Sequence, residues 1–201
     1  MSNSVYDIVI SAMLNSLRNL DAIVGKAEAH VEADKNLDAE TLLRARLYPN
    51  MRPFLFQIQV ATDTAKGAAA RLTGKPVPSW PDDEKTFADV HARIGKTIDY
   101  LSGFTPADFD GAEERAIELK IGSYKLDFTG SSYAARFALP NFFFHVTTAY
   151  DILRHNGVPI GKAEIVRKGA DVTVLTYGTL VHVAEAAAQK AQIDAEIIDI
   201  R

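Results

Sequence analysis

The sequence predicts a mainly α-helical protein: a four-helix bundle with a β-hairpin insertion, followed by a short C-terminal βαβ fragment. Four long segments before residue 160 repeat apolar residues at steps of three and four, which is the period of a helix with one buried face. The period changes to two at residues 117–128, and short strand-like runs follow residue 160. We therefore expect two parts, residues 1–160 forming the bundle and residues 161–201 forming the fragment.

The first helix is expected to begin at Ser4, because Asp7 three residues later completes a capping-box-like start. Its apolar stripe comprises Val5, Val9, Ala12, Ser16, Leu20, Ile23 and Ala27. Asp38 is then expected to cap a short helix through Leu47, which ends where Pro49 forces its neighbour out of the helical region.

The second long helix is expected to start with Pro53 at its first position and to stop at Gly74. Its seam comprises Phe54, Ile58, Ala61, Ala65, Ala68 and Leu72. Residues 74–81 carry three prolines and no periodicity, so they predict a stiff connection. The third helix is expected over residues 87–101, with Asp82 and Asp83 complementing the positive end of its dipole.

Apolar and polar residues alternate over 117–121 and again over 124–128, and Gly122-Ser123 suits a two-residue turn with glycine first. A fourth helix is expected from Ser131 or Ser132, broken or restarted at Pro140 and ended by Asn156-Gly157. Its stripe comprises Phe142, Val146, Ala149 and Leu153.

The tail is expected to contain strands at residues 163–167, 171–176 and 195–200, with a helix capped by Thr179 before the last strand. The run Val172–Leu175 is typical of a strand buried on both faces. The turn at Tyr177-Gly178-Thr179 leads from a strand into a helix, a place where backbone N–H groups can hold an anion.

Composition narrows the classes of partner. The net charge of −4 provides no basic field, so we expect no nucleic-acid partner. The chain has no cysteine, which excludes disulfides, thiolate metal sites and thiol nucleophiles. Residues 1–20 lack the pattern of a signal peptide, and the apolar stretch Phe137–Val146 is shorter than the roughly 20 residues of a membrane span. We expect a cytoplasmic protein without a membrane partner.

Three motifs carry a resemblance to a known family: ARLYPNM at residues 45–51, AKGAAARLTG at 65–74, and LPNFFFHVTTAY at 139–150, continued by LRHNGV at 153–158. They resemble a bacterial domain-of-unknown-function family of the DinB/YfiT-like superfamily, whose members are expected to be metalloenzymes. The resemblance covers about residues 1–162. It implies a helical bundle that forms a homodimer, and it implies no particular reaction.

The tail carries a second resemblance, through VPIGKAEIVR at residues 158–167, DVTVLTYG at 171–178 and AEIIDIR at 195–201. These strings resemble the start of the transketolase C-terminal domain of 2-oxo acid dehydrogenase beta subunits. The short string VPIGK fits both families. We therefore expect a fusion or chimera whose second part is truncated, without thiamine-dependent catalysis.

The superfamily places one histidine on its second helix and two histidines, four residues apart, on its fourth. His145 matches the first position of that pair, but Ala149 stands at the second, and the second helix offers Gln57, Gln59 and Asp63 instead. The resemblance therefore implies an incomplete metal triad, and no metal ligand is assigned. No cofactor is indicated.

His145 is the candidate catalytic residue, as a reduced metal ligand or as a general acid or base helped by Asp63 or Gln59. The structural alternative is a half-buried histidine satisfied by a polar neighbour. Gln59, Asp63 and Arg46 are the candidate ligand-binding residues. Arg46 would bind an anionic ligand or, as we favour, pair with a carboxylate.

Other chemically notable side chains have structural explanations. His30 and His91 are expected to be solvated, and His155 is expected to complement the negative end of the fourth helix. Phe142-Phe143-Phe144 is expected to fill the core and a helix–helix or dimer contact. Trp80 is a candidate loop lid, although packing over the bundle end is the commoner role.

The leading functional hypothesis is a dimeric small-molecule-binding or stress-related module without a complete metal triad. The first alternative is a metal-assisted or acid/base transferase that uses His145. The second is a docking fragment that associates with a thiamine-dependent 2-oxo acid dehydrogenase. The class of the small-molecule ligand is left open.

Overall fold

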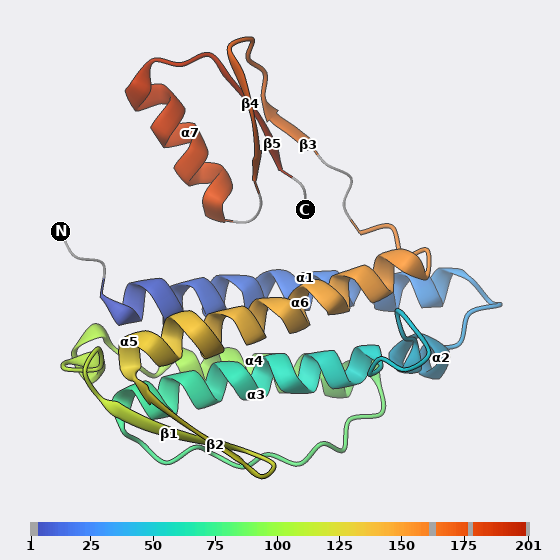
Figure 1. The fold of residues 1–201 in the computed structure, drawn as a ribbon. Helices are drawn as coiled ribbons and strands as arrows, with labels where there is room; N and C mark the ends of the chain where they lie inside the picture. Colours follow the sequence, from blue (N-terminus) through green and yellow to red (C-terminus); the bar gives the residue numbers. More distant parts are fainter. Residues whose placement is uncertain (1–3, 161–163, 177–178, 200–201) are drawn as a thin grey trace. The chain divides into compact units, whose positions relative to one another are not determined.

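The computed structural model describes residues 4–160, 164–176 and 179–199. The chain divides into two compact units, Met1–Val158 and Pro159–Arg201. The first unit is a bundle of α1 (Ala12–Ala33), α3 (Phe54–Thr73), α4 (Phe87–Ser102) and α6 (Leu139–His155) (Figure 1). Helices α1 and α3 each pack against both α4 and α6, so the four helices enclose one apolar core. The predicted mainly α bundle with a hairpin is confirmed.

A π-helical turn, Tyr6–Ser11, leads directly into α1. The start of this helix has the predicted contacts between Ser4 and Asp7. The Ser4 hydroxyl accepts a hydrogen bond from the Asp7 amide at 3.2 Å and donates one to the Asp7 carboxylate at 2.8 Å. Tyr6–Ala33 is the one helix among the described residues that is long and apolar enough to span a membrane. Its apolar face packs into the bundle, which accounts for that composition: Val9, Met13, Leu17, Leu20, Val24 and Ala27 are fully buried.

The short helix α2 spans Ala39–Arg44 and is capped by the Asp38 carboxylate, which accepts the Thr41 amide at 2.9 Å. It ends three residues before the predicted Leu47. Helix α3 keeps the predicted seam, and it ends at Gly74, whose φ of 72° is the left-handed conformation that glycine adopts without strain.

The connection from α3 to α4, residues 75–86, runs as a long coil along the side of the bundle (Figure 1). Thr86 caps α4 in a reciprocal box with Asp89, in which the Asp89 amide donates to the Thr86 hydroxyl at 3.1 Å. The prediction for Asp82 needs correction, because its carboxylate lies 2.9 Å from the Arg93 guanidinium. A 3-10 turn, Pro106–Phe109, follows α4.

The hairpin consists of β1 (Ala116–Ile121) and β2 (Tyr124–Thr129), which pair antiparallel with Ile121 opposite Tyr124. Gly122 takes the first turn position with a φ of 58°, as predicted. Ile117 and Leu119 are buried, whereas Tyr124 on the second strand is 74% exposed. The alternation therefore predicted the register correctly, but only the first strand buries its apolar face.

The last part of the bundle is helical without a break. Helix α5 (Gly130–Tyr133) passes through a π-helical turn, Ala134–Ala138, into α6. Pro140 lies in the first turn of α6, directly after the π-helical turn, so the helical path continues through the proline and is not broken there. Of the predicted stripe, Phe142, Ala149 and Leu153 are buried.

The second unit is a three-stranded sheet with one helix. Its strands are β3 (Glu164–Arg167), β4 (Val172–Thr176) and β5 (Ala195–Asp199), in the order β3-β5-β4, and α7 spans Thr179–Ala191. Strand β5 pairs parallel with β4 and antiparallel with β3, so the predicted βαβ unit is present. Its small apolar cluster contains Ala188, Ala195 and Ile197, with Val174 and Ala184 against it.

One expectation for this unit is wrong, because Val172 is 46% exposed and β4 is an edge strand. The three-stranded sheet does not bury that end of β4 on both faces. The anion-binding turn proposed at Tyr177-Gly178-Thr179 includes Tyr177 and Gly178, which lie outside the described residues.

Candidate functional site

His145 lies on the middle of α6 and faces α3. Its Nδ1 is 2.7 Å from Oε1 of Gln57, whose own Nε2 donates to the Arg52 carbonyl at 3.0 Å. Because a main-chain carbonyl only accepts, the Gln57 amide must present its oxygen to the histidine. The imidazole therefore carries its proton on Nδ1, and Nε2 keeps its lone pair.

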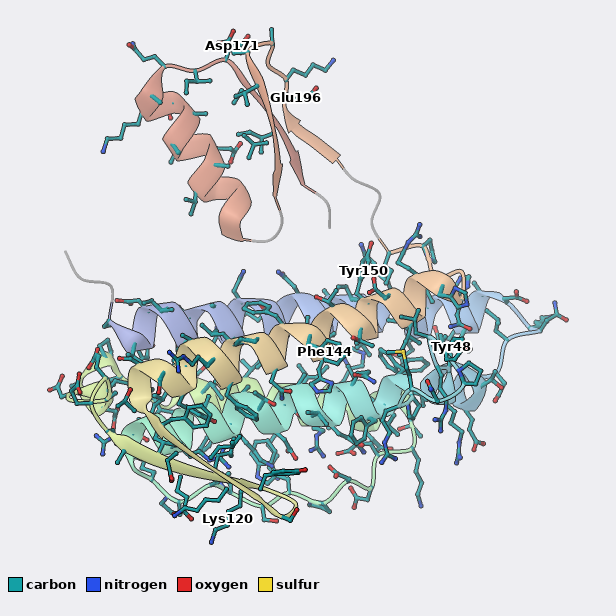
Figure 2. All side chains as sticks on the ribbon, viewed as in Figure 1. Tyr48, Lys120, Phe144, Tyr150, Asp171 and Glu196 are labelled. Atoms are coloured by element: carbon teal, nitrogen blue, oxygen red, sulfur yellow. The ribbon has the colours of Figure 1, made fainter. Side chains whose placement is uncertain are left out.

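The surroundings of His145 favour the neutral ring. Burial lowers the pKa of His145 below its ordinary value of 6.5, and its side chain is half-buried between the edges of Phe56 and Phe144. A neutral imidazole whose Nε2 keeps its lone pair can accept a proton or ligate an ion. Phe144, labelled in Figure 2, is 56% exposed beside it.

The donors around His145 do not fit the three-histidine metal site of the superfamily. Ala149, one turn further along α6, is fully buried and carries no donor. Across the described ranges, no three His, Asp or Glu side chains come close enough together to hold a metal ion. The expected helpers Gln59 and Asp63 also lie in a different network from the His145–Gln57 pair.

That second network centres on Arg93 of α4, whose side chain is only 3% exposed. Its Nε donates to the buried Thr62 hydroxyl at 2.8 Å. Its Nη1 donates to the Pro81 carbonyl at 3.0 Å and to Glu84 at 2.6 Å, and its Nη2 lies 2.8 Å from Asp63 and 2.9 Å from Asp82. The guanidinium thus donates four hydrogen bonds, and the Asp82 carboxylate adds an ion pair.

Arg93 holds the 75–86 connection against the bundle, because three of its acceptors belong to that connection. We call Arg93, Thr62, Asp63, Pro81, Asp82 and Glu84 the arginine clasp. Gln59 also joins it by donating to Glu84 at 2.9 Å. Burial opposes ionisation of Glu84, but the hydrogen bonds from Gln59 and Arg93 outweigh it and lower the Glu84 pKa below 4.5.

Trp80 lies between two lysine ammonium groups beside the clasp. Nζ of Lys66 is 4.4 Å from the centre of the indole ring, and Nζ of Lys96 is 4.6 Å from it. Tyr100 meets the indole edge-on at 6.1 Å. Trp80 therefore packs on the flank formed by α3 and α4, and the expectation that it covers the end of the bundle is wrong.

A pocket of about 310 Å³ opens between α3 and the connection. It is lined by Asp63, Lys66, Arg71, Val77, Pro78, Ser79 and Trp80. We call it the flank pocket. A second pocket of about 210 Å³ is also lined by Trp80, together with Arg93 and Lys96.

The other sequence candidates lie apart from these networks. Arg46 donates to the Met51 carbonyl at 2.6 Å, so it fixes the turn before α3, and no carboxylate among the residues that the structure describes forms the pair favoured for it. His91 is half-buried rather than solvated, because its Nδ1 lies 2.6 Å from Asp21 across α1 and α4. His155 is exposed in the last turn of α6, as predicted.

Sequence reasoning missed Arg93, Lys66 and Arg71. One signal for Arg93 was available: it lies in the same helical stripe as Val90, Ile94 and Thr97, where a charged residue requires buried partners. Those partners come from residues 62–84, and no local pattern predicts them.

The fold and these sites define a helical-bundle protein with a half-buried histidine paired to a glutamine and a polar pocket on its flank. Residues 5–166 match the family model described as "Domain of unknown function (DUF1993)", and the chain belongs to that family. A solved structure of a DinB family member protein from Shewanella denitrificans is 42% identical, with a TM-score of 0.70 over 78% of this chain and 88% of that one.

Residues 161–201 match the transketolase C-terminal domain. A 44-residue stretch is 66% identical to the 2-oxoisovalerate dehydrogenase subunit beta of Pseudomonas aeruginosa, covering 22% of this chain and 13% of that protein. The corresponding protein of Bacillus subtilis is 34% identical over 100 residues, which is 31% of its length. The chain thus spans less than a third of either relative.

Proposed function

We propose that this protein is a small-molecule-binding module of the DUF1993 family that works as a homodimer in the cytoplasm. The flank pocket is the observation that supports binding. Its volume of about 310 Å³ is at the lower end of the range for small-molecule sites, and it combines the Trp80 ring with three charged side chains. The arginine clasp holds one wall of this pocket in place, which reduces the entropy lost when a ligand binds.

Binding is tested by thermal denaturation of the full chain with a panel of small molecules of different charge. Ligands that raise the Tm of the wild type should have no effect on Trp80→Ala, because that variant lacks one wall of the pocket. Tyr124→Ala is the matched control, since Tyr124 is 74% exposed at the hairpin turn. Shifts that persist in Trp80→Ala would contradict the proposal.

The homodimer is supported by apolar side chains on the bundle surface. Tyr48 and Phe144, both labelled in Figure 2, are 64% and 56% exposed. Sedimentation equilibrium should give twice the 22.0 kDa mass of the chain, and Phe144→Ser should shift it towards the monomer. A monomeric wild type at micromolar concentration would contradict this part.

A second candidate function is acid/base transfer at His145, and the Gln57 hydrogen bond favours it. That bond leaves a neutral Nε2 able to take a proton at pH 7. His145→Ala and His145→Gln should both abolish any transfer activity while preserving the fold. If His145→Ala leaves every ligand-binding, metal-binding and turnover signal unchanged, this candidate is discarded.

A third candidate, association with a thiamine-dependent dehydrogenase, is favoured by the 66% identity over 44 residues. It predicts that the tagged full chain co-purifies with a 2-oxo acid dehydrogenase from its own host. A monodisperse homodimer recovered without such a partner would speak against it.

A further inference from the structure

The cations near the flank pocket differ in how their charge is used. Arg93 donates four hydrogen bonds within the clasp and does not line the pocket, whereas Lys66 and Arg71 on α3 do line it. The flank pocket thus has two basic groups and one acidic group, Asp63, on its walls. Its lining carries a net charge of about +1 at neutral pH.

Lys66 has donors to spare. Its side chain is 5% exposed, and its Nζ contacts one carboxylate oxygen, Oδ1 of Asp63, at 2.6 Å. That same oxygen also accepts from Arg93 at 2.8 Å, so Asp63 shares its charge between two cations. An ammonium has three N–H donors, and Asp63 accounts for one of them. Nζ also lies 4.4 Å from the centre of the Trp80 ring, so a second oxygen acceptor would complement the carboxylate and the indole around this buried cation.

Arg71 is held without a carboxylate partner among the described residues. Its Nη1 donates to the Tyr133 hydroxyl at 3.2 Å, and its guanidinium carbon lies 6.0 Å from the centre of the Tyr133 ring. Both contacts leave the charge of the guanidinium uncompensated. A planar guanidinium of this kind is suited to a carboxylate or phosphate, which it can bind through two N–H groups.

Gly67 provides the space in which the Arg71 guanidinium lies. A Cβ at position 67 would collide with Nη1 of Arg71, one helical turn away. The backbone of Gly67 has ordinary helical geometry, so φ does not require glycine here. Glycine in a helix interior costs about 0.5–1 kcal/mol relative to alanine. The sequence therefore has a residue of low helix propensity at position 67, and the space it leaves allows the Arg71 side chain to lie along α3.

We infer that the flank pocket binds a small organic monoanion, with its oxyanion between Nζ of Lys66 and the guanidinium of Arg71 and its apolar part against Trp80 and Val77. This rests on the proposed function and names the ligand class for it. One negative charge neutralises the net charge of the lining, and the indole face supplies the apolar contact. Ser79 also lines the pocket.

Trp80 is the single tryptophan of the chain, so intrinsic fluorescence reports directly on the pocket. The full-length protein is titrated with cyclohexanecarboxylate, with its neutral amide and with inorganic phosphate, all at constant ionic strength. The carboxylate should change Trp80 emission saturably. The amide should bind at least tenfold more weakly because it lacks the charge, and phosphate should be weaker because it lacks the apolar part.

Three variants test the assigned groups. Lys66→Met and Arg71→Gln should each raise the carboxylate Kd at least tenfold. Gly67→Ala should also raise it, because the new methyl displaces the Arg71 guanidinium, while the Tm stays equal to or above that of the wild type. Lys96→Met is the matched control: Lys96 also contacts the Trp80 ring but does not line the flank pocket, so its Kd should stay within twofold.

The possible outcomes separate the two proposals. Equal binding of the amide and the carboxylate, abolished by Trp80→Ala, would overturn the anion assignment and leave a binding pocket in place. Unchanged carboxylate affinity in both Lys66→Met and Arg71→Gln would likewise overturn it. Phosphate binding as tight as that of the carboxylate would overturn the apolar part of the assignment. If none of the three probes and no member of the panel binds, both proposals fail.

Discussion

Glu84 accepts a hydrogen bond from Nη1 of Arg93 at 2.6 Å, which joins an otherwise irregular connection to the middle of α4. The Glu84 side chain is 8% exposed and the Arg93 side chain 3%. Such a buried pair is costly to break, because the remaining partner is left charged and desolvated. The Arg93–Glu84 pair accounts for the close packing of the proline-rich connection, which has no secondary structure of its own.

Arg93→Met should destabilise the protein by about 3 kcal/mol or more, since it leaves the buried Glu84 carboxylate without its cation and the Thr62 hydroxyl oxygen without its donor. Urea unfolding measures the change, and limited proteolysis should show new cleavage within residues 75–86. Arg44→Met is the control: Arg44 forms an exposed ion pair with Glu40 at 2.8 Å, and its loss should cost less than about 0.5 kcal/mol. Similar losses in both variants would show that the clasp has no special stabilising role.

The contribution of Glu84 should depend on pH. Its pKa in the folded protein lies below the ordinary value of 4.5, because the hydrogen bonds from Gln59 and Arg93 outweigh burial. The folded state therefore binds its proton less readily than the unfolded state, and the stabilisation is fully present above pH 4.5. This stabilisation is lost as the pH falls through the pKa that Glu84 has in the folded protein.

The difference in unfolding free energy between the wild type and Glu84→Gln should accordingly be large at pH 7 and shrink below pH 4.5. Glu40→Gln, at an exposed position, provides the reference series. A difference that stays constant from pH 7 to pH 3 would mean that the Glu84 charge is not stabilised by the fold.

The state of His145 can be observed directly by ¹⁵N NMR. At pH 7 the ring should be neutral with its proton on Nδ1, and its pKa should lie below 6.5 because burial disfavours the imidazolium. Gln57→Glu should raise that pKa above the wild-type value by placing a carboxylate at Nδ1. Gln57→Leu serves as the uncharged comparison. An Nε2-protonated tautomer in the wild type would refute the assigned hydrogen bond.

Two glycines should respond to alanine in opposite ways. A Cβ at Gly130 would collide with the main-chain carbonyl of Ala112, which cannot move aside as a side chain can. Gly130→Ala should therefore lower the free energy of unfolding by several kcal/mol, roughly the cost of severe overpacking. Gly95 of α4 has open space at its Cβ position, so Gly95→Ala should raise stability by about 0.5–1 kcal/mol. Thermal unfolding measures both changes. A Gly130→Ala variant more stable than Gly95→Ala would contradict this account.

The helices and the hairpin were predictable because their signals are local. The seam of α3 and its stop at Gly74 need only nearby residues, and the pairing of Ile121 with Tyr124 follows from a two-residue turn. The π-helical turns before α1 and α6 were not predicted, because an extra residue per turn leaves no mark on a short apolar stripe.

The candidate site was predicted only in part. Gln59 and Asp63 do lie in a polar network, but it includes Arg93 rather than His145. The contact between Arg93 and Asp63 joins residues 30 positions apart on two helices, so it depends on how α3 and α4 pack. Asp82 was expected to interact with the dipole of α4, because that explanation needs only nearby residues. In the structure its partner is the Arg93 side chain, which reaches it through tertiary packing.

The clasp has a consequence for how the protein opens. Three residues of the 75–86 connection depend on Arg93 for their contacts, so this connection, with Trp80 on it, stays in place only while α4 keeps its position beside α3. We therefore expect local opening of this flank to be coupled to the helix pair instead of occurring as independent loop motion.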